Sequence, residues 1–169
     1  MNKTIALYLR ISVKQRDNDN IERQEEHLKS YVKYHNNNPD NEHWKVTKVY
    51  KDDGRTGRDL NRPAVRKLIQ DMEFWADKVQ HGEHSPIDIV LVKAIDRLAR
   101  NTYDGLMLYH KYMKPCNIEL ISATQYFDTA TSVGRLSFRT LLSMSEFESD
   151  MISERVKQGQ AAARKRGFV

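Results

Sequence analysis

Three residues near the amino terminus, Tyr8, Arg10 and Ser12, have the types and spacing needed to act on a phosphate group. They stand in or directly after an apolar run at residues 5–9, which has the length of a buried strand. In open α/β sheets the carboxyl ends of the strands form the edge where ligands bind, so we expect Arg10 and Ser12 there. A hydroxyl beside a guanidinium suits attack on a phosphate, because the planar fork of arginine neutralises phosphate oxygens. A structural alternative stays open, in which Ser12 only caps a turn and Arg10 pairs with an acid.

A second charged cluster, formed by Asp96, Arg97 and Arg100, comes soon after an apolar run at residues 87–92. Arg97 and Arg100 are three positions apart and therefore share one face of a helical turn. Asp96 could orient an arginine or cap the helix. If residues 87–92 form a parallel strand, the two arginines join Ser12 at one edge of the sheet and make an anion site there. The alternative is a set of inert surface Asp–Arg pairs, which are common.

The polar segment at residues 52–61 contains Asp52 and two glycines, and Arg62 and Pro63 follow it. Glycines permit sharp backbone turns, so we expect a loop here. Pro63 favours the first turn of a helix, which places Arg62 at a helix N-terminus, another position that binds anions. The alternative is a mobile surface loop without a ligand.

Short apolar or alternating runs are separated by segments typical of amphipathic helices. We expect strands at residues 5–9, 44–50, 87–92 and 118–121, and helices at residues 20–34, 63–79 and 103–113, the last one ending before Pro115. Strands that alternate with helices at this spacing indicate βαβ units. The sequence therefore predicts an α/β fold with a mostly parallel sheet of four or five strands, flanked by helices.

The last part of the chain, residues 134–166, contains no proline and consists mostly of good helix formers. A single helix of this length would measure about 50 Å, whereas a domain of residues 1–133 would have a diameter of roughly 36 Å. We therefore expect a domain at residues 1–133 and a long projecting helix within residues 134–169. Apolar residues lie on more than one side of the first half of this helix, although one domain surface covers only one stripe. They predict self-association through the helix, as a dimer or tetramer.

The excess positive charge is confined to the C-terminal segment. The chain has 28 lysines and arginines and 23 acids, and five of these cations lie after residue 154, where there is no acid. The other 23 cations match the 23 acids, so residues 1–154 are formally neutral. A basic segment of this kind indicates a polyanion, most often nucleic acid, although cations also suit the C-terminal end of a helix dipole. The predicted DNA-binding residues are Arg155, Lys157, Arg164, Lys165 and Arg166.

The sequence carries no signal for a cofactor, a metal or a membrane. It has no glycine-rich nucleotide motif, and neither a cysteine nor a second histidine pair completes a zinc site around His81 and His84. No apolar run approaches the roughly 18 residues of a membrane span. The single cysteine, Cys116, excludes an internal disulfide and is consistent with a reducing cytoplasm. We expect no metal site, no nucleotide or other cofactor, no membrane association, and a cytoplasmic location on DNA.

Taken in their order along the chain, these motifs resemble the serine recombinases, the family of resolvases, invertases and large serine integrases and transposases. The resemblance rests on Tyr-x-Arg-x-Ser at 8–12, Gln24, Asp-x-Gly-x-x-Gly at 52–57, Asn-Arg-Pro at 61–63, Asp-Arg-x-x-Arg at 96–100 and the long C-terminal helix. It covers almost the whole chain. It implies a metal-independent enzyme without cofactors, whose partner is double-stranded DNA.

The resemblance also implies a role for each matched residue. Ser12 would be the nucleophile that forms a phosphoseryl bond to a DNA 5′ end. The residues that would complete the catalytic site are Arg10, Arg62, Asp96, Arg97 and Arg100. The arginines would bind the scissile phosphate, and the aspartate would orient them. The residues that would support this site are Tyr8, Gln24 and Asp52.

Within the family, the segment at 14–20 and the insertion at 82–86 are more similar to the large serine integrases and transposases than to the small resolvases. Family members continue from the long helix into a DNA-binding region, which these 169 residues do not contain, so we expect a catalytic fragment. The expected biology is integration, excision or transposition of a mobile element. Two alternatives stay open, namely a metal-dependent nuclease that uses Asp52, Asp53 and Asp96, and a non-enzymatic dimerising DNA-binding module.

Overall fold

The computed structural model describes residues 2–11, 20–52, 62–99, 102–124 and 128–165. A four-stranded sheet lies at its centre, and its strands are β1 (Asn2–Arg10), β2 (His43–Asp52), β3 (Ile89–Val92) and β4 (Glu119–Ser122). All the pairings are parallel, and the strands lie in the order β2-β1-β3-β4. The predicted parallel sheet is confirmed, with four strands in the described part of the chain.

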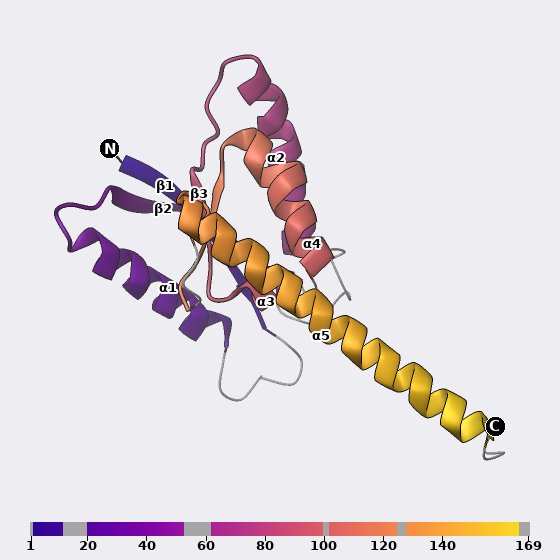
Figure 1. Cartoon of the computed structure of the whole chain (residues 1–169). Helices are drawn as coiled ribbons and strands as arrows, with labels where there is room; N and C mark the ends of the chain where they lie inside the picture. Colours follow the sequence, from indigo (N-terminus) through magenta and orange to yellow (C-terminus); the bar gives the residue numbers. More distant parts are fainter. Residues whose placement is uncertain (1, 12–19, 53–61, 100–101, 125–127, 166–169) are drawn as a thin grey trace.

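Helices cover both faces of this sheet (Figure 1). The α-helices are α1 (Ile21–Asn36), α2 (Pro63–Gln80), α3 (Ile95–Leu98), α4 (Thr102–Met107) and α5 (Ser132–Lys165). Helix α1 packs on one face, whereas α2, α3 and the segment that follows α4 pack on the other. The predicted α/β class with flanking helices is therefore confirmed.

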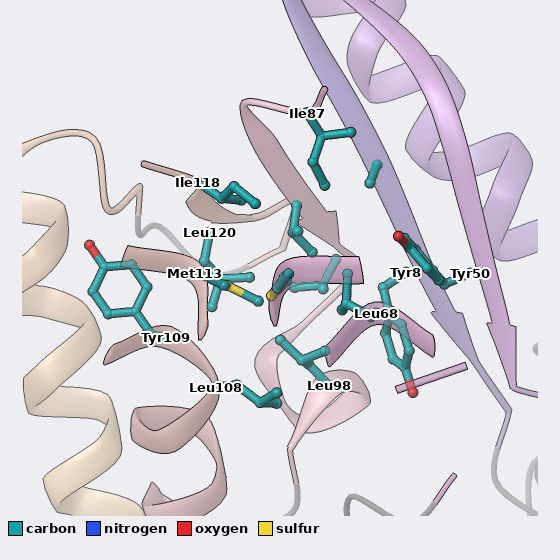
Figure 2. Close-up of a cluster of buried hydrophobic side chains, with 14 of the residues drawn as sticks. Tyr8, Tyr50, Leu68, Ile87, Leu98, Leu108, Tyr109, Met113, Ile118 and Leu120 are labelled. Carbon is teal, nitrogen blue, oxygen red and sulfur yellow. The ribbon is translucent and has the colours of Figure 1, made fainter. Parts of the chain in front are cut away.

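The central strand β1 divides its side chains between two cores. Ile5, Leu7 and Leu9 pack against α1, while Ala6 and Tyr8 point into the core on the α2 face. This division follows from the two-residue period of a strand. Figure 2 shows part of the α2-face core, with Tyr8 on one side of it and Tyr109 on the other. Tyr8 therefore lies on the α2 face of the sheet, the face on which the candidate site described below is built.

The first two helices begin at residues suited to that position. The side chain of Asn20 caps α1 by accepting a hydrogen bond from the backbone N–H of Arg23 at 2.8 Å. Helix α2 begins with Pro63, which has no N–H and therefore removes one of the donors that a helix start leaves without an intrahelical partner. Both starts agree with the sequence pattern.

The prediction that the third helix ends before Pro115 is wrong. Helix α4 continues as a π-helix, η2 (Leu108–Met113), and then as a 3₁₀-helix, η3 (Lys114–Cys116). Pro115 lies in the first turn of this 3₁₀-helix, where its missing N–H leaves no bond unmade. The helical segment ends at Asn117, which adopts the left-handed conformation with φ of 56°. The segment includes Leu108, Tyr109 and Met113, which are buried in the α2-face core.

Strand β3 begins two residues later than the apolar run predicts. Asp88 is the reason, because its carboxylate accepts hydrogen bonds from the backbone N–H of Thr4 at 2.7 Å and from the Thr4 hydroxyl at 2.8 Å. The side chain of Asp88 thus takes a donor of β1 that regular strand pairing would use. Ile87, although buried, lies outside the strand.

The predicted long C-terminal helix is present as α5. The Thr131 hydroxyl caps it by accepting from the backbone N–H of Gly134 at 2.9 Å. A Cβ at Gly134 would stand 1.9 Å from the carbonyl oxygen of Asp128, so this position requires glycine. Phe138 is 1% exposed and packs edge-on against Tyr109, which joins the start of α5 to the domain. Farther along, α5 projects away from the sheet and its helices (Figure 1). Within the described residues, no helix combines the length and hydrophobicity needed to cross a bilayer.

Candidate active site

The carboxyl ends of three neighbouring strands bring polar residues to one edge of the sheet, which we call the carboxyl edge. Arg10 ends β1 and is the register partner of Asp52, which ends β2. On the other side of β1, Tyr8 pairs with Val92, the last residue of β3. Helix α3, which carries Arg97, follows β3 after two residues. The described residues of the first and second charged clusters therefore stand at the same edge of the sheet, as the sequence predicts.

Gln24 on α1 fixes the backbone of Arg10 through two hydrogen bonds. Its Nε2 donates to the carbonyl oxygen of Arg10 at 3.0 Å, and its Oε1 accepts from the backbone N–H of Arg10 at 3.3 Å. Gln24 is 1% exposed and Arg10 is 9% exposed, so both bonds are shielded from water. A buried amide with both ends paired favours a single arrangement of the backbone. The chain therefore leaves β1 in a defined direction two residues before Ser12.

Asp52 connects β1 to the start of α2 from a buried position. It is 4% exposed, and its Oδ2 accepts a hydrogen bond from the Tyr8 hydroxyl at 2.6 Å. Its Oδ1 accepts from the backbone N–H of Ala64 at 2.9 Å, in the first turn of α2. A carboxylate at a helix N-terminus pairs N–H groups that have no partner within the helix. Asp52 thereby fixes where α2 begins relative to the carboxyl edge.

Arg62 immediately precedes α2, and its side chain points into the protein. It is 3% exposed, and its two terminal nitrogens donate to the carbonyl oxygens of Arg97 at 3.1 Å and of Leu98 at 2.5 Å. Its guanidinium carbon also lies 5.8 Å from the centre of the Tyr8 ring, a distance at which a cation is attracted to an aromatic face. Arg62 therefore connects α2 to α3 and fixes the backbone on which Arg97 stands.

The Tyr8 hydroxyl is a hydrogen-bond donor and stays protonated at physiological pH. Burial raises the pKa of this hydroxyl far above its ordinary value, and the hydrogen bond to Asp52 raises it further, although Arg62 and Arg10 act in the opposite direction. A tyrosine that keeps its proton donates to a carboxylate and does not act as a base. Tyr8 therefore belongs with the residues that hold Asp52 and Arg62 in place.

The family to which the chain belongs follows from comparison with known proteins. A family model described as "Resolvase, N terminal domain" matches residues 5–169. The chain belongs to the resolvase family of serine recombinases. The sequence resemblance is thereby confirmed.

Two curated relatives of this recombinase domain come from mobile elements. The Transposon Tn917 resolvase of Enterococcus faecalis is 30% identical over 125 residues, which are 74% of this chain and 60% of the relative. The DNA-invertase of Escherichia phage P1 is 28% identical over 118 residues, which are 70% of this chain and 56% of the relative. The chain thus spans somewhat more than half the length of these relatives.

Solved structures show the same fold. The crystal structure of the N-terminal catalytic domain of TP901-1 integrase matches with a TM-score of 0.66 and 30% identity, over 88% of this chain and 98% of that one. A resolvase family site-specific recombinase from Streptococcus pneumoniae matches with a TM-score of 0.65 over 96% of this chain and 99% of that one, and its identity of 20% supports the fold alone. Because resolvases, invertases and an integrase domain are all similar to this recombinase domain, the large-recombinase subfamily stays a prediction.

The structure brings part of the predicted catalytic set together. Arg10, Arg62 and Arg97 meet around the carboxyl edge, through β1, the start of α2 and α3. Ser12 and Arg100 lie outside the described residues.

Other predicted residues are described only in part. The backbone of Asp96 belongs to α3, but its side chain is not described. Of the predicted DNA-binding residues, Arg155 is exposed on α5, and the backbones of Lys157, Arg164 and Lys165 belong to the same helix. Arg166 lies outside the described residues, as does Asp53, which the nuclease alternative would need.

Two structural roles escape the sequence reasoning. The position of Arg62 before Pro63 suggests an anion site at a helix N-terminus, whereas its guanidinium donates to the backbone of α3. The partner of Asp52 on α2 is a backbone N–H, which has no sequence signal of its own. A buried aspartate before a loop and a helix-starting proline is the only hint of it.

Proposed function

We propose that this recombinase domain cuts and rejoins DNA through a covalent bond to Ser12. The Ser12 oxygen attacks the scissile phosphorus, the P–O3′ bond breaks, and a 5′-phosphoseryl intermediate forms. The serine proton leaves during attack, and the departing 3′ oxygen takes up a proton. Rejoining is the reverse reaction with the 3′ hydroxyl of another strand. The enzyme thus conserves the phosphodiester bond as an ester to serine.

One observation carries this proposal, namely that hydrogen bonds from Gln24 and Arg62 hold the backbones of Arg10 and Arg97 at the carboxyl edge. Phosphoryl transfer depends mainly on positioning and on stabilising the charge of the phosphate oxygens. Gln24 holds the backbone of Arg10, and Arg62 holds the backbone of Arg97. With Arg100 and Asp96, these arginines would bind the scissile phosphate beside Ser12. No metal or other cofactor is required for such a site.

We place Arg62 among the positioning residues, because both of its terminal nitrogens donate to carbonyl groups of α3. A substitution of Arg62 would therefore affect DNA cleavage by displacing the backbone of Arg97. Arg62→Lys supports this role if kcat falls while the KM for DNA stays unchanged, because a lysine cannot donate to two carbonyls with the same fork.

Self-association through α5 is the second part of the proposal. Four exposed side chains of this helix, from Val133, Leu136, Met144 and Phe147, fall within about 80° of one another at 100° per residue. The buried Phe138 lies on a different side of the helix. The stripe is continuous with a groove of about 710 Å³ between α1, the end of β4 and the start of α5, which Val133 also lines.

A second copy of the domain is the occupant that we propose for this stripe, in a dimer or tetramer. Exposed apolar stripes of this length on a helix are typical of helix–helix interfaces. The basic end of α5 would then extend past the interface to double-stranded DNA, in the cytoplasm. Sedimentation should show an oligomer that Leu136→Glu with Phe147→Glu converts to a monomer, and a wild-type chain that is monomeric at high concentration would contradict the proposal.

Covalent trapping tests the chemistry directly. The protein is incubated with a nicked suicide DNA substrate, in the presence of EDTA, and the modified residue is mapped by mass spectrometry. We expect DNA attached to Ser12 and no attachment in Ser12→Ala. Cleavage that EDTA abolishes and that leaves no protein on the DNA would favour the metal-dependent nuclease. DNA binding without any cleavage would favour the non-enzymatic module.

A further inference from the structure

A basic pocket lies at the end of the sheet opposite the carboxyl edge. It has a volume of about 270 Å³ and lies between the segment after α4, the start of β4 and the start of α5. Four basic side chains line it, those of His110, Lys114, Arg135 and Arg139. Glu119, the first residue of β4, also lines it, which places the pocket at the amino ends of the strands. None of the residues proposed for DNA cleavage contributes to the lining.

The positive charge in this pocket is not balanced by the described lining residues. Glu119 is the only acid among them, and it already accepts a hydrogen bond from the hydroxyl of Thr129. Burial, Lys114 and Arg139 together lower the pKa of His110 below its ordinary value. Lys114 and Arg139 therefore lie close enough to the His110 ring to disfavour its protonation.

The positions of the arginines add to this imbalance. Arg135 and Arg139 are four residues apart on α5, a spacing at which like charges repel each other. Arg135 also stands in the first turn of α5, where the helix dipole disfavours a cation. Its guanidinium is held by the carbonyl oxygens of Thr129 at 2.7 Å and of Ala130 at 2.9 Å. These acceptors are neutral, so a bound anion would offset the repulsion between the two arginines.

We propose that this pocket binds a phosphate group carried by a small molecule or by inorganic phosphate. Its volume is slightly below the 300–1,000 Å³ of ordinary ligand sites, so a phosphate with a small substituent fits it better than a large cofactor does. Cations that converge on one cavity suit a discrete dianion. The DNA backbone, in contrast, spreads its single charges along a line. Lys114 and Arg139 would contact the phosphate oxygens, and Arg135 would hold the α5 side of the pocket.

Calorimetric titration with sodium phosphate, at constant ionic strength and without DNA, tests this site independently of Ser12 chemistry. We expect one phosphate per chain, and adenosine monophosphate in place of phosphate distinguishes a small phosphorylated ligand from the free ion. The variant Lys114→Gln with Arg139→Gln should weaken binding by at least about tenfold, because each lost contact is a charge-assisted hydrogen bond. Both substituted side chains are exposed, so the fold should be retained, which circular dichroism checks.

The matched control is Lys33→Gln with Lys45→Gln, which removes the same charge from exposed positions on α1 and β2. It should bind phosphate as the wild type does, within about twofold of its affinity, since long-range screening leaves little effect at physiological salt. The proposal is overturned if the wild type binds no phosphate, or if the pocket variant and the control bind it equally well. It is also overturned if the pocket variant loses affinity for a 20-base-pair duplex while its phosphate affinity matches that of the control, because the cations then contact DNA.

Discussion

Removing the Tyr8 hydroxyl isolates one hydrogen bond on which the arrangement of the carboxyl edge depends. In Tyr8→Phe the ring stays in the core and beneath Arg62, whose guanidinium carbon lies 5.8 Å from the ring centre. The variant therefore loses only the 2.6 Å bond to Oδ2 of Asp52. Asp52 keeps its bond to the backbone N–H of Ala64.

The size of the effect follows from burial and charge. Tyr8 is 1% exposed and Asp52 is 4% exposed, so water does not replace the lost donor. A hydrogen bond to a charged group contributes about 1.5–3 kcal/mol to the free energy of unfolding. We expect Tyr8→Phe to lower it by that amount and Asp52→Asn to lower it by about 1–3 kcal/mol. Because the two side chains share one bond, the double variant should lose about 1–2 kcal/mol less than the sum of the single variants.

Urea unfolding of the four proteins measures this coupling, and the trapping assay measures DNA cleavage in parallel. Tyr50→Phe is the matched control, since its hydroxyl donates to Asp71 at 2.7 Å in a similar tyrosine–carboxylate pair. It should destabilise the fold but leave the rate of cleavage per folded molecule unchanged, whereas Tyr8→Phe should lower that rate. Additive losses in the double variant, or equal cleavage rates for Tyr8→Phe and Tyr50→Phe, would refute the reasoning.

Three further predictions concern other parts of the domain. Gln24→Ala removes both side-chain hydrogen bonds to the backbone of Arg10 and should lower the free energy of unfolding by about 2 kcal/mol or more. It should reduce DNA cleavage more than DNA binding, and an equal loss of both would contradict a positioning role. Gly134→Ala places a Cβ against the carbonyl oxygen of Asp128 and should cost about 1–3 kcal/mol in urea unfolding, and a neutral result would show that α5 shifts freely. Burial raises the pKa of Asp71, but hydrogen bonds from two lysines and a tyrosine outweigh it and lower that pKa below its ordinary value. The carboxylate therefore stabilises the fold above the ordinary aspartate pKa of about 3.9 and loses this effect as the pH falls through the lowered pKa. Asp71→Asn should therefore destabilise the domain at pH 7, and by progressively less as the pH falls below about 4.

The carboxyl edge is predictable because it depends on periodicity and chain direction alone. The apolar runs that contain Tyr8 and Val92 define two buried strands, and strands joined through helices run parallel. Parallel strands place their carboxyl ends together, so the elements that carry Arg10 and Arg97 lie at the same edge of the sheet. The long helix is likewise visible in the sequence, because no proline interrupts residues 134–166.

The direction of individual side chains is less accessible from the sequence. Arg62 and the carbonyl oxygens that it contacts lie 35 and 36 residues apart along the chain, and nothing in the local pattern connects them. The basic pocket combines Lys114 with Arg139 from separate elements, so its charge is not visible in any one segment. The helical segment through Pro115 depends on a change from α to π and 3₁₀ geometry, which helix propensities do not encode.

The buried charges explain why the carboxyl edge can be arranged before a phosphate arrives. Arg62 and Asp52 are both nearly inaccessible to water, and each would be costly there if its polar atoms were unpaired. Asp52 on β2 accepts from Tyr8 on β1 and from the backbone of α2, and Arg62 donates to the backbone of α3, so the two side chains join four elements of the domain. In the proposed reaction, an incoming phosphate would meet Arg10 and Arg97 on backbones that are already fixed, and little reorganisation would oppose attack by Ser12. Because this rigidity depends on bonds behind the arginines, substitutions at Asp52 and Arg62 should reduce the rate of cleavage more than the affinity for DNA.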